Sequence, residues 1–147
     1  MIRLAQAGEA DALRDLVRAA YAHYVPRLGR EPMPMIDDYA ARIAAGQAWL
    51  LEDGAALIGA LVLEDTLEGL LIDNIAVAEA ARGAGHGRNL MGFAEDEARR
   101  RGQTRVWLYT NEKMVENIAL YSRLGYRETH REVQAGFSRV FMEKSVA

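Results

Sequence analysis

Residues 82–87, Arg-Gly-Ala-Gly-His-Gly, are the part of this sequence whose residue types and spacing point most directly to chemistry. An apolar run from Leu70 to Val77 precedes them and an amphipathic stretch follows, which predicts a connection between a strand and a helix. Glycines permit positive φ angles, and the first turn of a helix presents unpaired N–H donors at the positive end of its dipole. With Arg82 and Arg88 beside them, these residues predict a phosphate-binding loop; a glycine-rich turn without a ligand is the alternative.

Two well-known phosphate loops do not fit this segment. A Walker loop needs Gly-Lys followed by Ser or Thr, and no glycine here begins such a run. The dinucleotide pattern G-x-G-x-x-G, started at Gly83 and Gly85, needs a glycine where Arg88 stands. Thr110 and Asn111 end the next predicted strand, where that pattern expects an acidic residue. A nucleotide-binding domain of another kind is kept as an alternative.

Length and composition bound the class of protein. The 147 residues suit one domain, spanning 1–147, and 50% hydrophobic with 27% charged residues is typical of a globular protein. The 18 basic and 21 acidic side chains give a net charge of −3, so no overall positive field is available to hold nucleic acid or an anionic membrane. Any anion must therefore be bound locally.

The sequence contains no cysteine, which excludes disulfides, thiolate metal sites and a cysteine nucleophile, and no metal site is predicted. Its start, from Met1 to Asp11, has acidic residues and no apolar run of signal-peptide length. No stretch approaches the ~20 apolar residues of a membrane span. We expect a cytoplasmic protein with neither a nucleic-acid nor a membrane partner.

Hydrophobic periodicity and turn residues predict the elements before the glycine loop. All three prolines fall between Pro26 and Pro34, so this segment is expected to be a loop. Asp53-Gly54 is a strong hairpin signal, and Gly46 is expected to end the second helix. The expected elements are a strand at 2–4, helices at 10–24 and about 36–45, and antiparallel strands at 48–52, 56–64 and 70–77.

After the glycine loop, an apolar stripe at helical spacing predicts a helix that Gly102 ends. The run from Arg99 to Arg101 is interpreted as cations that complement the C-terminal dipole of this helix, rather than as a basic patch. The outward face is expected to carry Asn89, Glu95, Asp96, Arg99 and Arg100.

The last elements complete the predicted sheet. A strand at 105–110, with Trp107 and Tyr109 on one face, is expected to run parallel to the strand at 70–77. A helix at 115–124 follows. The chain closes with a hairpin of strands at 126–134 and 137–143.

Two motifs together resemble the GCN5-related N-acetyltransferase (GNAT) family. The acyl-CoA loop of that family has the pattern R/Q-x-x-G-x-G/A between a strand and a helix, which residues 82–87 match. A downstream helix of the form N-x-x-A-x-x-x-Y, or close variants, leads into Gly-Phe or Gly-Tyr; here Asn117, Ala119 and Tyr121 precede Gly125-Tyr126. The resemblance implies an α/β (α+β) fold with a mixed, mostly antiparallel central sheet flanked by helices and a splayed parallel strand pair.

The resemblance also implies an acetyl-CoA-dependent N-acetyltransferase. The N–H groups of residues 83–87, with Arg82 and Arg88, are implied to hold the pyrophosphate, and the backbone of residues 75–77 to pair with the pantetheine amides like an added strand. His86 is interpreted as a backbone donor with an exposed ring rather than as a base. The implied cofactor-binding residues are Ile75, Ala76, Val77, Arg82, Gly83, Ala84, Gly85, His86, Gly87, Arg88, Asn117 and Tyr121.

Asn117 and Tyr121 are four residues apart and therefore project from one face of their helix. The resemblance implies that Asn117 hydrogen-bonds the pantetheine arm and that Tyr121 places its hydroxyl near the sulfur. A phenol of pKa ~10 is protonated at neutral pH and can supply a proton to a leaving thiolate. A core aromatic and a helix cap are the alternative interpretation.

An acyl-cysteine intermediate cannot form in a chain without cysteine, so direct attack of the acceptor amine on the thioester is the simpler mechanism. The carbonyl is expected to be polarised by a backbone N–H near Val77. The amine must first lose a proton. Asp73 and Asn74, on the strand beside the thioester, and Glu112 are the candidates for accepting it, directly or through water; structural roles are the alternative.

The acceptor is expected to be a small-molecule amine or an amino group of a peptide or protein, which the sequence does not distinguish. Ordinary surface positions are the alternative for the expected substrate contacts, and both a monomer and a homodimer are compatible with the sequence. A non-catalytic acyl-CoA-binding sensor or regulatory module is the alternative function. The expected substrate-binding residues are Tyr21, Tyr24, Arg27, Arg30 and Asn74, with His23 nearby.

Overall fold

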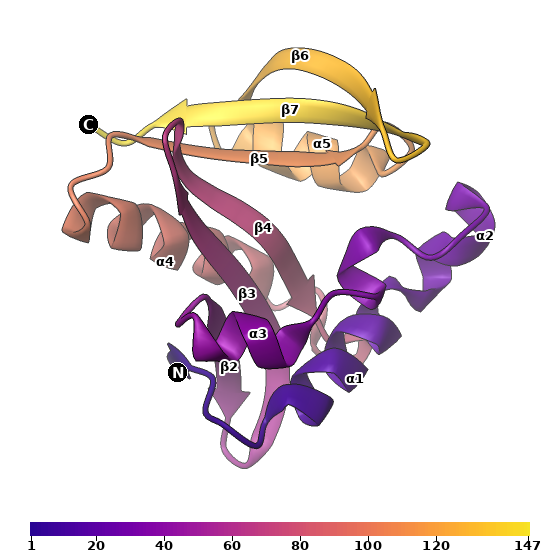
Figure 1. Cartoon of the computed structure of the whole chain (residues 1–147), viewed down its shortest axis with the longest axis vertical. Coiled ribbons are helices and arrows are strands. Elements are labelled where there is room, and N and C mark those ends of the chain that lie inside the picture. The colour runs from indigo at the N-terminus through magenta and orange to yellow at the C-terminus, as the bar shows by residue number, and fades with distance from the viewer. The chain divides into compact units, whose positions relative to one another are not determined.

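The computed structural model describes residues 1–147 (Figure 1). The strands are β1 (Ile2–Leu4), β2 (Ala48–Asp53), β3 (Ala56–Thr66), β4 (Gly69–Val77), β5 (Arg105–Asn111), β6 (Arg127–Gln134) and β7 (Phe137–Ser145). The α-helices are α1 (Ala10–Tyr21), α2 (Val25–Leu28), α3 (Tyr39–Ala44), α4 (His86–Arg100) and α5 (Val115–Arg123). Short 3₁₀ turns lie at Ala22–Tyr24 (η1), Met33–Met35 (η2) and Glu79–Ala81 (η3). None of the helices has the length and apolar character needed to cross a membrane.

The strands are hydrogen-bonded in the order β1-β2-β3-β4-β5-β7-β6. The pairs β1–β2, β2–β3, β5–β7 and β6–β7 are antiparallel, whereas β4 and β5 are parallel, from Leu70 opposite Val106 to Ile72 opposite Leu108. The expected fold class, a mixed and mostly antiparallel sheet with one parallel pair, is confirmed. The chain divides into two compact units: unit 1 is Met1–Leu63 with Asn74–Met91, and unit 2 is Glu64–Asp73 with Gly92–Ala147.

The core of unit 1 forms where α1 meets alternate residues of β2 and β3. Its buried members include Leu13, Val17, Ala20, Ala48, Leu50, Ala60 and Val62. Helix α3 begins later than the sequence pattern predicted, at Tyr39 instead of about Ile36, because the Asp38 side chain caps it by accepting a hydrogen bond from the Ala41 N–H at 3.1 Å. Gly46, with a φ of 70°, follows the end of this helix, as expected.

The proline-rich segment is more ordered than the predicted loop. Pro26 lies in the first turn of α2, a position where the fixed φ of proline suits a helix and its missing N–H is not needed. Helix α2 ends at Leu28 with Gly29 as its C-cap, and Pro34 lies within the 3₁₀ turn η2. The prediction of an irregular loop from residue 26 to residue 34 is therefore wrong in part.

Strands β5 and β7 of unit 2 have two unlike faces. The covered face packs against α4 and α5, and Figure 1 shows α5 behind the two strands. Its residues on the strands are Val106, Leu108, Thr110, Val140 and Met142, all buried. The open face carries Trp107 and Tyr109 of β5 and Phe141 of β7. The alternation expected for β5 is thus confirmed.

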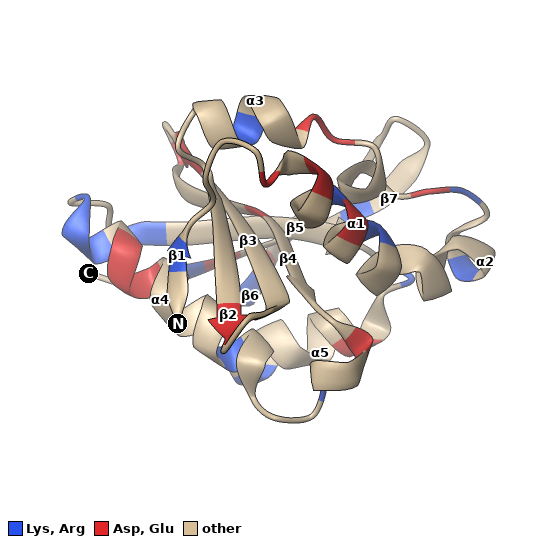
Figure 2. Cartoon of the chain, turned by 90° about the horizontal axis from the view of Figure 1, so that it is seen from below, with Lys and Arg blue, Asp and Glu red and all other residues tan.

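One residue of α4 contradicts the predicted outward face. Glu95 is buried, with 8% exposure, because the Tyr126 hydroxyl donates to its Oε2 at 3.1 Å and the Lys144 ammonium donates to its Oε1 at 2.9 Å. The arginines that end the helix also have specific partners, since Arg100 and Arg101 both pair with the buried carboxylate of Glu97. Figure 2 shows acidic and basic residues distributed over the helices and strands, including both signs on α4.

Candidate functional site

The glycine loop lies in unit 1, between η3 and the first turn of α4. Gly83 and Gly85 have φ angles of 86° and 82°, in the left-handed region that residues with a Cβ rarely adopt. A Cβ at either position meets no atom within 4 Å, so the backbone conformation, and not crowding, requires glycine there. The loop leads directly to His86, the first residue of the 15-residue helix α4, whose first turn provides N–H donors.

The two arginines of the loop differ in how they are held. Arg82 donates from Nη2 to the carbonyl oxygen of Ala20 at 2.8 Å, which ties the start of the loop to the last turn of α1. Arg88 is exposed and has no hydrogen-bond or ion-pair partner. His86 as a whole residue is half-buried. Of the two expected phosphate ligands, Arg88 is therefore the one whose guanidinium is fully available to an anion.

The end of β4 in unit 1 is hydrogen-bonded to two tyrosines, Tyr21 and Tyr39. The Tyr21 hydroxyl lies 3.0 Å from Oδ1 of Asn74 and 3.1 Å from the carbonyl oxygen of Ile75, while Nδ2 of Asn74 donates to the Tyr39 hydroxyl at 2.9 Å. Asn74 is 3% exposed. Tyr21 and Asn74, both expected to contact substrate, thus contact each other, and the Asn74 amide is engaged at both of its ends.

The remaining expected substrate contacts lie around Tyr24, which is buried, so the alternative of an ordinary surface position does not hold for this residue. Its ring centroid lies 3.9 Å from that of His23 and 5.9 Å from that of Tyr21, and the Arg27 guanidinium lies 5.3 Å from its centre. Tyr24 is therefore part of a packed aromatic group. Arg30 follows helix α2 and is exposed.

Unit 2 places Asn117 and Tyr121 on α5, as expected. Tyr121 is buried, with its ring edge-on to that of Tyr126 at 6.3 Å. Burial raises the pKa of the Tyr126 phenol well above its ordinary value, and the neighbouring Glu95 carboxylate raises it further. Nδ2 of Asn117 lies 3.7 Å from the sulfur of Met114. The Tyr121 ring is thus supported by a second, firmly protonated tyrosine.

The two carboxylates proposed to accept the amine proton have different surroundings in unit 2. Asp73 lies on β4, with the Tyr109 hydroxyl 3.5 Å from its Oδ1. Glu112 follows β5, is exposed, and lies 3.6 Å from the Arg131 guanidinium. No group of three or more His, Cys, Asp or Glu side chains forms a metal-binding cluster.

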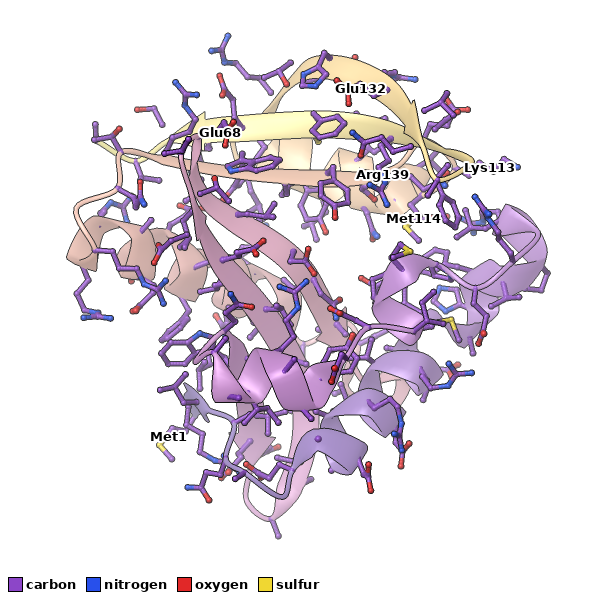
Figure 3. The ribbon with its side chains drawn as sticks, viewed as in Figure 1. Met1, Glu68, Lys113, Met114, Glu132 and Arg139 are labelled. Atoms are coloured by element: carbon purple, nitrogen blue, oxygen red, sulfur yellow. The ribbon has the colours of Figure 1, made fainter.

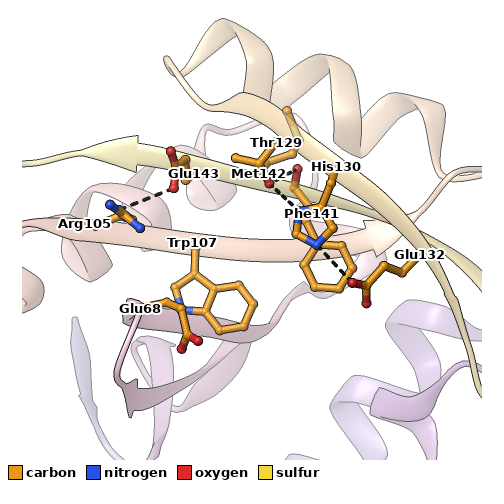
Figure 4. Close-up of a pocket in the computed structure, with 9 residues that line it drawn as sticks. All are labelled: Glu68, Arg105, Trp107, Thr129, His130, Glu132, Phe141, Met142 and Glu143. Carbon is orange, nitrogen blue, oxygen red and sulfur yellow. Dashed lines mark hydrogen bonds and ion pairs between the residues drawn. The ribbon is translucent and has the colours of Figure 1, made fainter.

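The open face of unit 2 also holds a cavity that the sequence interpretation missed (Figure 4). Its volume is about 360 Å³. It is lined by Glu68, Arg105, Trp107, Thr129, His130, Glu132, Phe141, Met142 and Glu143. The alternation that placed Trp107 and Tyr109 on one face was a usable signal, because aromatic residues opposite a buried face mark a surface on which a ligand can rest.

Comparisons with known proteins agree with these features. Residues 10–126 match the model of the acetyltransferase (GNAT) family. No curated protein sequence matches the chain. The fold is similar to that of PaiA N-acetyltransferase from Thermoplasma acidophilum in complex with coenzyme A, at 16% identity, with 99% of this chain and 98% of that chain covered and a TM-score of 0.82.

Two further solved structures share the fold. One is yncA from Salmonella typhimurium with its cofactor acetyl-CoA, at 21% identity, covering 100% of this chain and 94% of that chain with a TM-score of 0.77. The other is the ribosomal-protein-S18-alanine N-acetyltransferase from Escherichia coli, at 20% identity, with the same coverage and a TM-score of 0.78.

Proposed function

The chain belongs to the acetyltransferase (GNAT) family, and we propose that it transfers an acetyl group from acetyl-CoA directly to an amine of a small molecule or of a peptide or protein. The observation that carries this proposal is the loop with two left-handed glycines at the start of α4, in a chain that matches the family model over residues 10–126. The acetyl-CoA and coenzyme A in two structures of the same fold support the choice of cosubstrate.

The loop supplies the anion-binding part of this function. The N–H groups of Gly83 to Gly87 and of the first turn of α4, together with Arg88, bind the pyrophosphate, and Arg82 fixes the start of the loop through Ala20. The backbone from Ile75 to Val77 pairs with the pantetheine amides. The Ile75 carbonyl already accepts from Tyr21 but has a second lone pair for this contact.

The transfer itself forms one bond and breaks one. The amine nitrogen attacks the thioester carbonyl, the C–N bond forms, and the C–S bond breaks with the electron pair leaving on sulfur. Tyr121 gives its proton to the thiolate, and Asp73, directly or through water, accepts the proton that the amine loses. Asp73 is favoured over Glu112 because it is half-buried on β4 beside the Tyr109 hydroxyl, whereas Glu112 is exposed. Asn117 holds the pantetheine arm.

The loop is tested by Gly85→Ala, with Gly102→Ala as the matched control. Both glycines flank α4, both have positive φ, 82° and 75°, and neither has an atom within 4 Å of a Cβ. The two changes therefore carry a similar backbone strain of about 1–2 kcal/mol. Titration calorimetry is expected to show weaker acetyl-CoA binding for Gly85→Ala alone. Equal affinity in both folded variants would place the phosphates elsewhere.

The reaction is tested by thiol release from acetyl-CoA with a panel of amines. Tyr121→Phe keeps the ring against Tyr126 and is expected to lower kcat about 100-fold, the usual contribution of a general acid, with acetyl-CoA affinity unchanged. Tight acetyl-CoA binding without turnover of any amine would favour the non-catalytic binding module. Thermal stabilisation by ATP or NAD, and not by acetyl-CoA, would favour a nucleotide-binding domain.

A further inference from the structure

We propose that the cavity on the open face of unit 2 binds the non-reacting end of the acceptor, and that this end carries a second cationic group, so that the acceptor is a small diamine. The inference rests on the proposed function, because it specifies the acceptor of that reaction. The residues that line the cavity all belong to unit 2.

The cavity has an aromatic wall suited to a cation. His130 stacks on Phe141 at 4.3 Å between ring centroids, and Trp107 lies 6.3 Å from Phe141 in a nearly parallel plane. The Tyr109 ring already has the Arg139 guanidinium 4.5 Å from its centre. A cation is thus accommodated on this face in the structure itself, and Trp107, the strongest cation–π partner among the side chains, is the ring left for a ligand.

The charges of the lining leave one carboxylate without a partner. Glu143 lies 3.4 Å from the Arg105 guanidinium, which is the only arginine in the lining, and Oε1 of Glu132 lies 3.4 Å from Nε2 of His130. Glu68 is exposed and has neither a hydrogen-bond nor an ion-pair partner. Figure 4 shows its carboxylate beside the Trp107 ring. A cationic group bound there makes a cation–π contact with the Trp107 ring and an ion pair with the Glu68 carboxylate.

The turn that carries Glu68 is held in place by specific contacts. Nε1 of Trp107 donates to the Thr66 hydroxyl at 2.9 Å, and the same hydroxyl donates to the Gly69 carbonyl at 2.7 Å. Gly69 has a φ of 132°, and a Cβ there would lie 2.4 Å from the carbonyl oxygen of Arg105. Glycine therefore lets the turn approach β5 closely, and Figure 3 shows Glu68 at its tip. The hydrogen bonds of Thr66 and the close approach at Gly69 thus fix the position of Glu68 beside Trp107.

The same face connects this cavity to the proposed base. Tyr109 contacts Asp73 through its hydroxyl, and its ring centroid lies 6.4 Å from that of Trp107. An acceptor with one amine at Asp73 therefore extends along Tyr109 to Trp107 and Glu68. The volume of about 360 Å³ is in the range of small-molecule sites, so a small diamine fits it.

The test compares α,ω-diaminoalkanes with n-alkylamines of the same carbon number, by thiol release from acetyl-CoA. We expect a higher kcat/KM for the diamines. Glu68→Gln is expected to lower that kcat/KM about fivefold, the effect of one exposed ion pair, through KM and not kcat, while alkylamine rates stay unchanged. Glu68→Lys is expected to lower it further. Glu128→Gln, the same change at an exposed carboxylate outside the cavity, serves as the control.

Several outcomes overturn the proposal while leaving the acetyltransferase function in place. These are equal kcat/KM for diamines and alkylamines, unchanged diamine kinetics in Glu68→Lys, and a basic peptide that is a better acceptor than any diamine. If no amine is acetylated, the proposed function fails, and the cavity is tested by calorimetry with the diamines alone. Binding that Glu68→Lys removes then supports the cavity, and no binding overturns it.

Discussion

Each of the two faces of β5 and β7, covered and open, has aromatic rings next to a carboxylate. The carboxylate has bonding partners on the covered face and none on the open face. On the covered face Glu95 is buried and is bonded to both Tyr126 and Lys144. On the open face Glu68 is exposed and has no partner. A buried carboxylate must be paired because desolvation of its charge is costly, whereas an exposed one keeps its hydration. The covered face therefore stabilises unit 2, and the open face is left to bind a ligand.

The largest expected effect is a core truncation on the covered face. Leu108→Ala removes a side chain that is 2% exposed and is expected to lower the free energy of unfolding by about 3 kcal/mol, since it combines lost burial with a cavity. Urea denaturation measures this loss. Val133→Ala, at a position 74% exposed on β6, is the control and should leave the midpoint almost unchanged. Equal losses in the two variants would contradict the assignment of the faces.

The next largest effect is expected from a substitution that breaks the buried network of Glu95, Tyr126 and Lys144. Glu95→Ala leaves the Tyr126 hydroxyl and the Lys144 ammonium without their acceptor and is expected to cost about 2 kcal/mol of unfolding free energy. Glu128→Ala, at an exposed carboxylate of β6, is the control. A Glu95→Ala midpoint as high as that of the control would show that Glu95 turns outward, as its sequence position alone suggested.

The pH dependence follows from the raised pKa of Tyr126. Its phenol binds its proton more tightly in the folded state than in the unfolded state, where the pKa is ~10. The contribution of this phenol to the unfolding free energy is therefore complete below pH ~10 and is lost as the pH rises above that value. The unfolding free energy should then fall by up to about 1.4 kcal/mol per pH unit. Tyr126→Phe should flatten this alkaline decline and Glu95→Gln should reduce it. An unchanged slope in both variants would contradict the burial of this phenol.

The smallest expected effect lies on the open face. Thr66→Val removes the hydroxyl that joins Trp107 to Gly69 and is expected to cost about 1 kcal/mol of stability or less. Because it loosens the turn that carries Glu68, it should also raise KM for diamines while leaving KM for alkylamines alone. If the Thr66→Val variant loses stability but keeps its KM for diamines, the hydrogen bonds that hold the turn do not contribute to diamine binding.

Much of the fold was predictable because it depends on local patterns. Alternating residues of β5, the Asp53-Gly54 turn, and glycines after α3 and α5 specify strands and element ends through backbone conformation alone. The two motifs at residues 82–87 and 117–121 led to the family, which the match over residues 10–126 confirms. The roles of the site residues, the single domain, the cytoplasmic location and the oligomeric state stay predictions.

The amino-acid sequence by itself determined the order of the elements, the glycine loop and the family, because glycine conformation and hydrophobic periodicity act over a few residues. Only the tertiary structure decided which polar side chains are buried, since that depends on partners distant in the chain. Glu95 turns inward because Tyr126 and Lys144 meet it there, and Tyr21 bonds to Asn74 from 53 residues away. Glu68 lies beside Trp107 because the Thr66 hydroxyl and the close approach at Gly69 bring the turn to β5.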